Sequence, residues 1–273
     1  MMETEILREF GRRMDSSPNK KMIVDFVYHK SKNVLDLGAG TGKIACDIAD
    51  AYGCHVDAVD IAFKDDELRE HPLVTYHHQS IQDFLQENCY EKKYDCIIMS
   101  AVLHELNDNV AKDIASYLPM VMDEECRIII REPLWDNGLG PVLEKDRDEF
   151  IRLVKNALPS EKVQEYMLAT KKHLNDTQLF WFVGLDDWRD WVNTAFLFSY
   201  GKENWEREKH ECRFAYSLRR CKEMFDFWDR PIVSMFTKTV LDETYRQHFI
   251  DAGIPGEAFD LLKYTTMYVV FDY

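Results

Sequence analysis

Short apolar strands and amphipathic helices alternate along the first half of the chain. Runs of roughly four to eight residues with buried-strand character recur between helical patterns, an alternation typical of parallel βαβ units. The Tyr94–Ser100 run is almost continuously apolar, as expected of a central strand covered on both faces. We expect strands at Val34–Leu37, Val56–Ile61, Leu73–His78, Tyr94–Ser100 and Glu125–Glu132, and helices at Lys43–Ala51 and Asn107–Met122. The pattern predicts a doubly wound, mostly parallel α/β sheet.

The alternation stops after Glu132. From there to about Arg230 no strand pattern occurs, and all 6 tryptophans of the chain lie in this stretch. For most of them we favour ordinary packing in a helical core. The expected helices are Val142–Leu158, Ser160–Leu174, Leu185–Tyr200 and Asn204–Trp228. We predict three parts: residues 1–132 as the sheet core with N-terminal helices, 133–230 as a helical insertion after the fifth strand, and 231–273 as the completion of the sheet.

Both ends of the chain add further elements. We expect helices at residues 3–15, 20–30 and Thr239–Ala252, and a terminal strand at Tyr264–Asp272. A sixth strand is predicted either at Pro231–Phe236 or near Phe259–Leu262, and the pattern leaves both open.

Three glycines at every second position join the first strand to the helix that follows it. They are Gly38, Gly40 and Gly42, and such a turn leaves backbone N–H groups facing outward, where a polar or anionic ligand can approach. A dinucleotide fingerprint needs its third glycine three residues after the second, where Lys43 stands. A Walker A loop needs four residues between its glycines, whereas Gly38 and Gly42 enclose three. Spacing therefore excludes both nucleotide-binding motifs.

The acid two residues before this loop completes another pattern. With Asp36, the stretch resembles the first motif of class I S-adenosylmethionine-dependent methyltransferases, an acid followed by G-x-G-x-G. The second strand ends at Asp60, about 20 residues beyond the loop, where a carboxylate can accept both hydroxyls of a ribose. The resemblance covers roughly residues 33–132 and is weaker at the C-terminus, where it implies that the last strand returns antiparallel to the edge of the sheet. It implies a Rossmann-like fold that binds S-adenosylmethionine and transfers its methyl group, with the helical insertion as a substrate cap.

The resemblance also implies which residues form the cofactor site. Asp36 would lie near the amine end of S-adenosylmethionine, and Ile61 against its adenine. The family usually carries an acid at the position of Ser80, so either the Ser80 hydroxyl or Asp83 is expected to contact the adenine amino group. The implied cofactor residues are Asp36, Gly38, Ala39, Gly40, Gly42, Asp60, Ile61, Ser80, Ile81 and Ser100.

The turn after the fourth strand is the expected reaction centre. Ala101–Leu106 resembles a motif of small-molecule-type class I methyltransferases, in which this strand ends in a turn containing L-H. Ligands of such sheets lie at the carboxyl ends of the strands, so Ser100 to Glu105 should border the reacting methyl group. His104 is the best placed general base, with Glu105 and Glu132 behind it. The alternative is that His104 only packs against a lid or bonds to the backbone.

An aromatic and acidic run in the helical insertion is the candidate acceptor site. Glu208 and Glu211 are three residues apart within Phe196–Glu211, so they share a helix face with Trp205. Tyr200 and Trp205 would form a wall beside the acceptor, and either glutamate would anchor it. The competing interpretation is a surface helix whose glutamates pair with neighbouring basic side chains.

The acidic balance of the chain limits its partners. A net charge of −15 repels nucleic acid unless a basic patch overrides it, and only Gly201–Lys222 leans basic, with seven Lys/Arg against four Glu. The chain also lacks the N/D-P-P-Y/F tetrapeptide typical of enzymes that methylate nucleic-acid amino groups. A small-molecule acceptor is therefore favoured over nucleic acid. Two further alternatives stay open: a different transfer chemistry of the same cofactor, and a non-catalytic protein that binds it.

Cysteines and apolar runs bear on the compartment. The 7 cysteines are scattered without a C-x-x-C pair, so we expect free thiols, a reducing cytoplasm and no metal site. The N-terminal M-M-E-T-E-I-L-R-E-F lacks the basic leader and apolar run of an export signal. No stretch approaches the roughly 18 apolar residues of a membrane span. No pattern indicates an oligomeric state.

Overall fold

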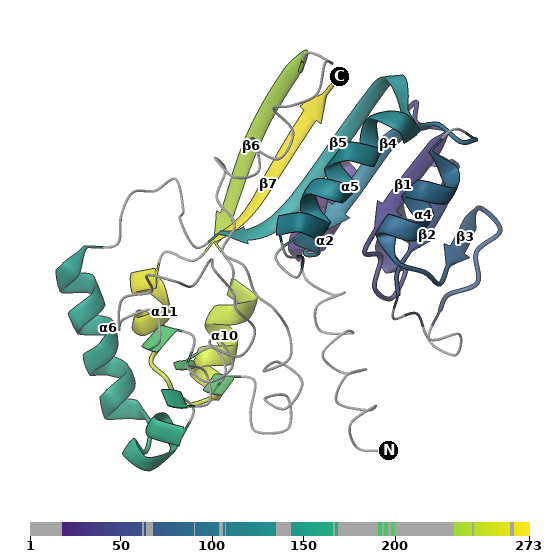
Figure 1. Ribbon diagram of the computed structural model, residues 1–273. Coiled ribbons are helices and arrows are strands. Elements are labelled where there is room, and N and C mark those ends of the chain that lie inside the picture. Colours follow the sequence, from purple (N-terminus) through teal and green to yellow (C-terminus); the bar gives the residue numbers. More distant parts are fainter. Residues whose placement is uncertain are drawn as a thin grey trace. The chain divides into compact units, whose positions relative to one another are not determined.

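The chain forms two compact units, a sheet unit and a helical unit. The sheet unit takes the described residues of 18–133, 232–240 and 266–273, and the helical unit those of 134–199 and 241–265 (Figure 1). The computed structural model describes residues 18–61, 63, 68–89, 91–103, 106, 108–134, 143–165, 167–168, 191–192, 194–195, 198–199, 232–241, 243–262 and 265–273. The predicted helix at residues 3–15 and the predicted helix Asn204–Trp228 lie outside these ranges.

Seven strands form the sheet in the order β3-β2-β1-β4-β5-β7-β6. Strands β1 to β5 are parallel to one another. In Figure 1 the arrow of β7 runs opposite to that of β5 and to that of β6. The seven strands are β1 Asn33–Leu37, β2 His55–Val59, β3 Val74–His77, β4 Tyr94–Ser100, β5 Met122–Leu134, β6 Ser234–Leu241 and β7 Thr265–Asp272. The predicted α/β, mostly parallel fold is confirmed.

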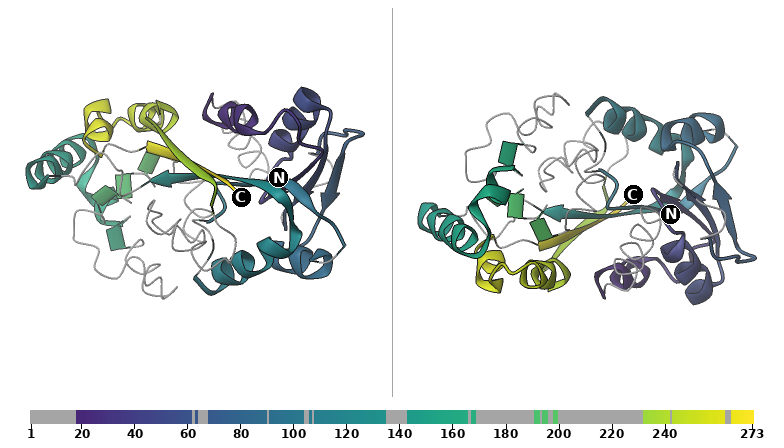
Figure 2. Two further views of the ribbon diagram at one scale, coloured as in Figure 1. Left: turned by 90° about the horizontal axis from the view of Figure 1, so that it is seen from above. Right: turned by 90° about the horizontal axis from the view of Figure 1, so that it is seen from below.

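Helices cover both faces of this sheet, which explains the continuous apolar run of β4. Ile97 and Ile98 point to opposite faces, yet both are fully buried. Figure 2 shows α2 and α3 on one face, and α4 and α5 on the other. The helices are α2 Pro18–Phe26, α3 Lys43–Tyr52, α4 Ile81–Asn88 and α5 Asp108–Val121. On the α2/α3 face, Ile23 and Ile44 pack against the alternating strand residues Val34 and Ile98.

The last two strands settle the open sixth strand and correct the predicted C-terminal order. Strand β6 overlaps the first candidate, Pro231–Phe236, whereas Phe259–Leu262 belongs to a helix. The expected helix Thr239–Ala252 is wrong at its start, because its first residues lie in β6, where β-branched side chains favour a strand. The expected edge position of the last strand is also wrong. Residues 267–271 of β7 are buried on both faces, so β7 is an inner strand, and the exposed β6 forms the edge.

Three described helices form the core of the helical unit: α6 Glu144–Ala157, α10 Glu243–Asp251 and α11 Gly256–Leu262. Phe150 and Val154 of α6 pack with Phe249 and Phe259 from the other two helices. Trp191 packs against this cluster, with the Lys155 ammonium 5.1 Å from its ring centroid. For this tryptophan the structure agrees with a role in the helical core; the other five lie outside the described residues. The predicted boundaries at 132 and 230 stay a prediction.

Candidate functional site

The glycine loop between β1 and α3 is shaped by close neighbours at two of its three glycines. Gly38, Gly40 and Gly42 all have positive φ, at 76°, 59° and 72°, a region that glycine adopts without strain. A Cβ on Gly38 would lie 2.6 Å from Val102 Cγ2, and one on Gly42 would lie 2.5 Å from Tyr76 Cε1. A Cβ on Gly40 would have no neighbour within 4 Å. The backbone at Gly40 is therefore the open part of the loop.

Backbone hydrogen bonds tie this loop to the end of β2 and bring Asp60 beside it. Gly38 N and Ala39 N both donate to Val59 O, at 2.9 and 3.1 Å. Asp60 Oδ2 accepts a hydrogen bond from Gly40 N at 2.9 Å, and Asp60 N donates to His77 O at 3.2 Å. The structure thus brings together the glycines and the acid that the sequence singled out 20 residues apart.

Next to Asp60 lies an exposed apolar side chain. Ile61 is 70% exposed, although it follows a buried strand, and its carbonyl accepts a hydrogen bond from His78 Nε2 at 2.8 Å. That bond ties the loop after β2 to the loop after β3. An apolar side chain held in the open beside a carboxylate is suited to pack against a flat ring.

Ser80 and Asp83, the two alternatives for an adenine contact, bond to each other. Ser80 is the N-cap of α4: its Oγ accepts a hydrogen bond from Asp83 N at 3.0 Å and donates one to Asp83 Oδ2 at 2.6 Å. Such reciprocal capping satisfies an otherwise unpaired amide of the first helical turn. The cap explains why serine stands at this position. Ile81 is the first residue of the same helix and is half-buried.

Asp36 is a buried carboxyl group without a hydrogen-bond partner. Its side chain is fully buried in β1, and neither Oδ1 nor Oδ2 has a partner among the described residues. Burial raises the pKa of Asp36 to about 7; the nearby charge of Lys20, from α2, acts to lower it, and that of Asp60 acts to raise it further. A buried carboxyl group normally has donors. Asp36 is therefore ready to accept a cation or a hydrogen-bond donor.

Two more polar side chains on the same sheet face lack partners. Ser100, the last residue of β4, is the register partner of Arg131 in β5, and the two are 8% and 3% exposed. Neither Ser100 Oγ nor Arg131 Nε has a hydrogen-bond partner in the described part of the chain. The sequence analysis named Ser100 but missed Arg131. The available signal was a charged residue at the end of the apolar run C-R-I-I-I-R-E.

The turn after β4 is held by Glu132. Ala101 has a φ of 57°, which is uncommon for a residue with a Cβ, and its N–H donates to Arg131 O at 2.7 Å. Glu132 is fully buried, and its Oε1 accepts hydrogen bonds from Val102 N at 2.9 Å and Leu103 N at 2.7 Å. These bonds make Glu132 a brace for the turn, and its predicted place behind a general base at His104 stays a prediction.

The remaining predicted residues lie outside the described part of the chain: His104, Glu105, Tyr200, Trp205, Glu208 and Glu211. Within the described residues, no group of three or more His, Cys, Asp or Glu side chains could hold a metal ion. None of the helices placed there is both long and apolar enough to cross a membrane.

Residues 12–195 match a family of methyltransferase domains. The match covers more than half of the chain. The chain belongs to this methyltransferase family. The cofactor of the family is S-adenosylmethionine, as the resemblance of the glycine loop implied.

Solved structures share the fold of this methyltransferase. A cyclopropane-fatty-acyl-phospholipid synthase-like protein from Lactobacillus casei matches with a TM-score of 0.51 at 12% identity, over 97% of this chain and 93% of that one. The plantazolicin methyltransferase BpumL, solved with a triazolic desmethylPZN analog and SAH, matches at 0.50 and 11%, over 98% and 90%. An O-methyltransferase family protein from Burkholderia thailandensis matches at 0.41 and 16%, over 52% of this chain and only 46% of that one. A comparison with curated proteins gives no match. At these identities the likenesses show the fold alone.

The described residues fit S-adenosylmethionine. Asp36 offers a buried carboxyl group without donors, Gly40 an open backbone, and Ile61 an exposed apolar side chain. These are the groups that a cationic amino-acid end, a ribose and an adenine would need. These residues come from strand β1, the loop that follows it and the loop after β2.

Proposed function

We propose that the chain is an S-adenosylmethionine-dependent methyltransferase that acts on a small-molecule acceptor. The observation that carries this proposal is the pairing of Asp60 with Gly40 N beside a buried Asp36 whose oxygens have no partner in the described structure. A loop that only connected a strand to a helix would need neither feature.

Each described residue has a separate part in holding the cofactor. Asp60, fixed by Gly40, would bind the ribose hydroxyls, Ile61 would cover the adenine, and Asp36 would receive the ammonium group. Ser100 Oγ, buried without a partner in the described part, would complete the wall at β4. The bound cofactor supplies an electrophilic methyl group on a sulfonium. The residues position it and exclude water, since rate enhancement by alignment of the reactants needs little further chemistry from the protein.

The acceptor side rests on the turn after β4. Glu132 braces Val102 and Leu103, which lie immediately before His104 in the chain. We propose His104 as the group that takes a proton from a hydroxyl or amine acceptor, with Glu105 next to it. Tyr200, Trp205, Glu208 and Glu211 are the proposed acceptor contacts.

A small molecule suits the charge of the chain better than nucleic acid. At −15, the chain would repel a polyanion at long range. The five described cysteines, Cys46, Cys54, Cys89, Cys96 and Cys126, are all buried and free, and we infer a reducing, cytoplasmic setting from them.

Titration calorimetry with S-adenosylhomocysteine tests the cofactor assignment. Wild-type protein should bind it, and Asp60→Ala should bind it at least tenfold more weakly, a loss of about 1.4 kcal/mol. Asp113→Ala, which removes an exposed acid on α5 that bonds Gln82, is the matched control and should bind as wild type does. Wild-type protein without affinity would overturn the proposal. A separate experiment identifies the acceptor class. The protein is incubated with methyl-labelled S-adenosylmethionine and a fractionated lysate, and the label is measured in small molecules, nucleic acid and protein.

A further inference from the structure

Two arginines of β5 lie on the same sheet face but differ in their partners. Arg127 donates from Nε and Nη2 to Asp272 at 2.6 and 2.9 Å and from Nη1 to Phe26 O at 2.9 Å, and its guanidinium lies 3.5 Å from the Tyr28 ring centroid. For Arg131, four residues further along, the described part of the chain shows no ion pair, and its Nε is unpartnered. Arg127 is a structural arginine. Arg131 is 3% exposed, and the described residues do not provide its charge with the ion pair that a buried charge requires.

The strand register places Arg131 on the same face as Asp36. Asp36 is the register partner of Ile98, and Arg131 that of Ser100, two residues further along β4. Residues two apart in a strand share a face, and Ile98 packs in the core beneath α2 and α3. Two strand spacings and two residues of rise separate the Asp36 and Arg131 Cα atoms by about 12 Å. An extended arginine and an aspartate at that separation bracket a small zwitterion and need not touch each other.

We propose that Arg131 binds the carboxylate at the amino-acid end of the cofactor, opposite the ammonium group that the proposed function assigns to Asp36. This inference rests on the proposed function and adds to it the charge selection at one end of the site. A guanidinium binds a carboxylate through two parallel hydrogen bonds, and burial excludes the water that would weaken them. Ser100, between the two charges on β4, adds a neutral hydroxyl without a partner in the described structure. Within the described residues neither the Asp36 carboxyl oxygens nor Arg131 Nε has a hydrogen-bond partner, and the two ends of the ligand would supply one to each.

Two ligands that differ only at the amino-acid end test this proposal. S-adenosylhomocysteine carries the carboxylate and ammonium group, whereas 5′-methylthioadenosine keeps the nucleoside and thioether and lacks both. By titration calorimetry, Arg131→Met should weaken S-adenosylhomocysteine at least tenfold, about 1.4 kcal/mol, and leave 5′-methylthioadenosine unchanged. Arg131→Lys, which keeps the charge but not the bidentate geometry, should recover part of the loss. Arg152→Met removes an exposed arginine paired with Glu149 and is the matched control.

Folding of the variant gives a second readout. Because the described residues provide no partner for Nε of the buried Arg131, Arg131→Met should melt at the same temperature as the free wild-type protein or higher. Unchanged affinity of Arg131→Met for S-adenosylhomocysteine would overturn the proposal, and so would an equal loss for both ligands, which a structural arginine would give. If wild-type protein bound neither ligand, the proposed function itself would be overturned.

Discussion

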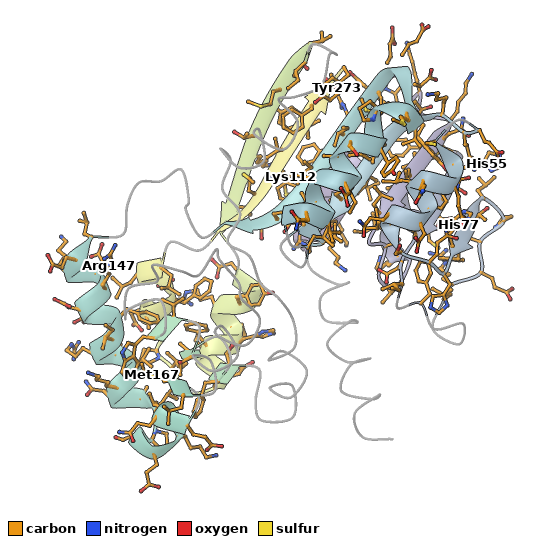
Figure 3. All side chains as sticks on the ribbon, viewed as in Figure 1. His55, His77, Lys112, Arg147, Met167 and Tyr273 are labelled. Atoms are coloured by element: carbon orange, nitrogen blue, oxygen red, sulfur yellow. The ribbon has the colours of Figure 1, made fainter. Side chains whose placement is uncertain are left out.

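Two pairs of charged residues in the same sheet differ in the partners that their side chains have. Asp57 and Arg127 have full sets of partners: Asp57 accepts from His77 Nε2 at 2.9 Å, from Tyr94 OH at 2.8 Å and from Lys92 Nζ, and Arg127 binds Asp272 with two nitrogens. Asp36 and Arg131 have carboxyl and guanidinium groups without such partners in the described chain. His77, at the end of β3, is labelled in Figure 3.

The two aspartates show the contrast in their ionisation. Burial acts to raise the pKa of Asp57, but hydrogen bonds from His77, Lys92 and Tyr94 outweigh it and lower the pKa to about 2. For Asp36, no hydrogen bond from the described residues opposes the effect of burial, which raises the pKa to about 7. The described residues therefore stabilise the Asp57 carboxylate and provide no hydrogen bond to Asp36, which agrees with the ligand-binding role proposed for Asp36. The hydrogen bonds of Asp57 add to the stability of the fold, whereas the burial of Asp36 lowers it, as expected of a residue in a binding site.

The largest expected effect is the loss of the satisfied carboxylate. Asp57→Asn removes the charge that Lys92 and His77 bond, so the free energy of unfolding should fall by about 3 kcal/mol. Because the folded pKa lies below the ordinary 3.8, the contribution of Asp57 is present above that pH and lost as the pH falls toward 2. Urea unfolding at neutral pH and between pH 4 and 2 measures both. Affinity for S-adenosylhomocysteine should be unchanged; a variant as stable as wild type would contradict the contrast.

The glycines offer the next contrast. Gly38→Ala places a Cβ 2.6 Å from Val102 at a φ of 76° and should cost about 2 kcal/mol of stability. Gly40→Ala has no neighbour within 4 Å and should cost only about 1 kcal/mol, from its φ of 59°. The methyl group at Gly40 should instead weaken S-adenosylhomocysteine, because it stands on the open backbone. Thermal unfolding and calorimetry of the two variants separate these effects; equal changes in both would deny that Gly40 faces the ligand.

The smallest expected effect distinguishes two roles of Glu132: positioning the turn after β4 or taking part in catalysis through its carboxylate. Glu132→Gln keeps an oxygen that accepts from Val102 N and Leu103 N, so turnover should fall by a few-fold, about 1 kcal/mol or less. Glu132→Leu removes the acceptor and should lower turnover at least tenfold with little change in cofactor affinity. Single-turnover rates with methyl-labelled cofactor compare them. Loss of activity in Glu132→Gln as complete as in Glu132→Leu would make the carboxylate a catalytic group.

Strong periodicity explains how much of the fold could be predicted. The first four strands were predicted within one or two residues. For β1, β2 and β4 the reason is that parallel strands buried on both faces give largely apolar runs, whereas β3 is a partly exposed edge strand. The order of β6 and β7 could not be predicted, since an inner strand and an edge strand differ in their neighbours across the sheet. The first residue of β5, Met122, was assigned to the preceding helix for a related reason: it pairs with Tyr94, far away in sequence.

In the candidate site, too, features with a local sequence pattern could be predicted and features that depend on distant contacts could not. The glycines and Asp60 were found because their pattern is local and regularly spaced. Arg131 was missed, because the sequence shows an arginine but not whether the fold provides it with a partner. Ser80 was interpreted as a departure from the family pattern, and its role as a helix cap became visible only with the Asp83 contacts.

Urea unfolding of wild type and Asp36→Asn, with and without S-adenosylhomocysteine, tests the central claim most directly. A folded pKa raised to about 7 means that the stability of the wild-type protein falls as the pH rises from about 4 to 7, so at pH 7.5 the free variant should equal or exceed it. Saturating ligand should stabilise wild type by about 1.4 kcal/mol more than the variant, the signature of a tenfold affinity difference. A variant that is less stable without ligand and gains as much with it would show that Asp36 serves the fold, and would contradict the account.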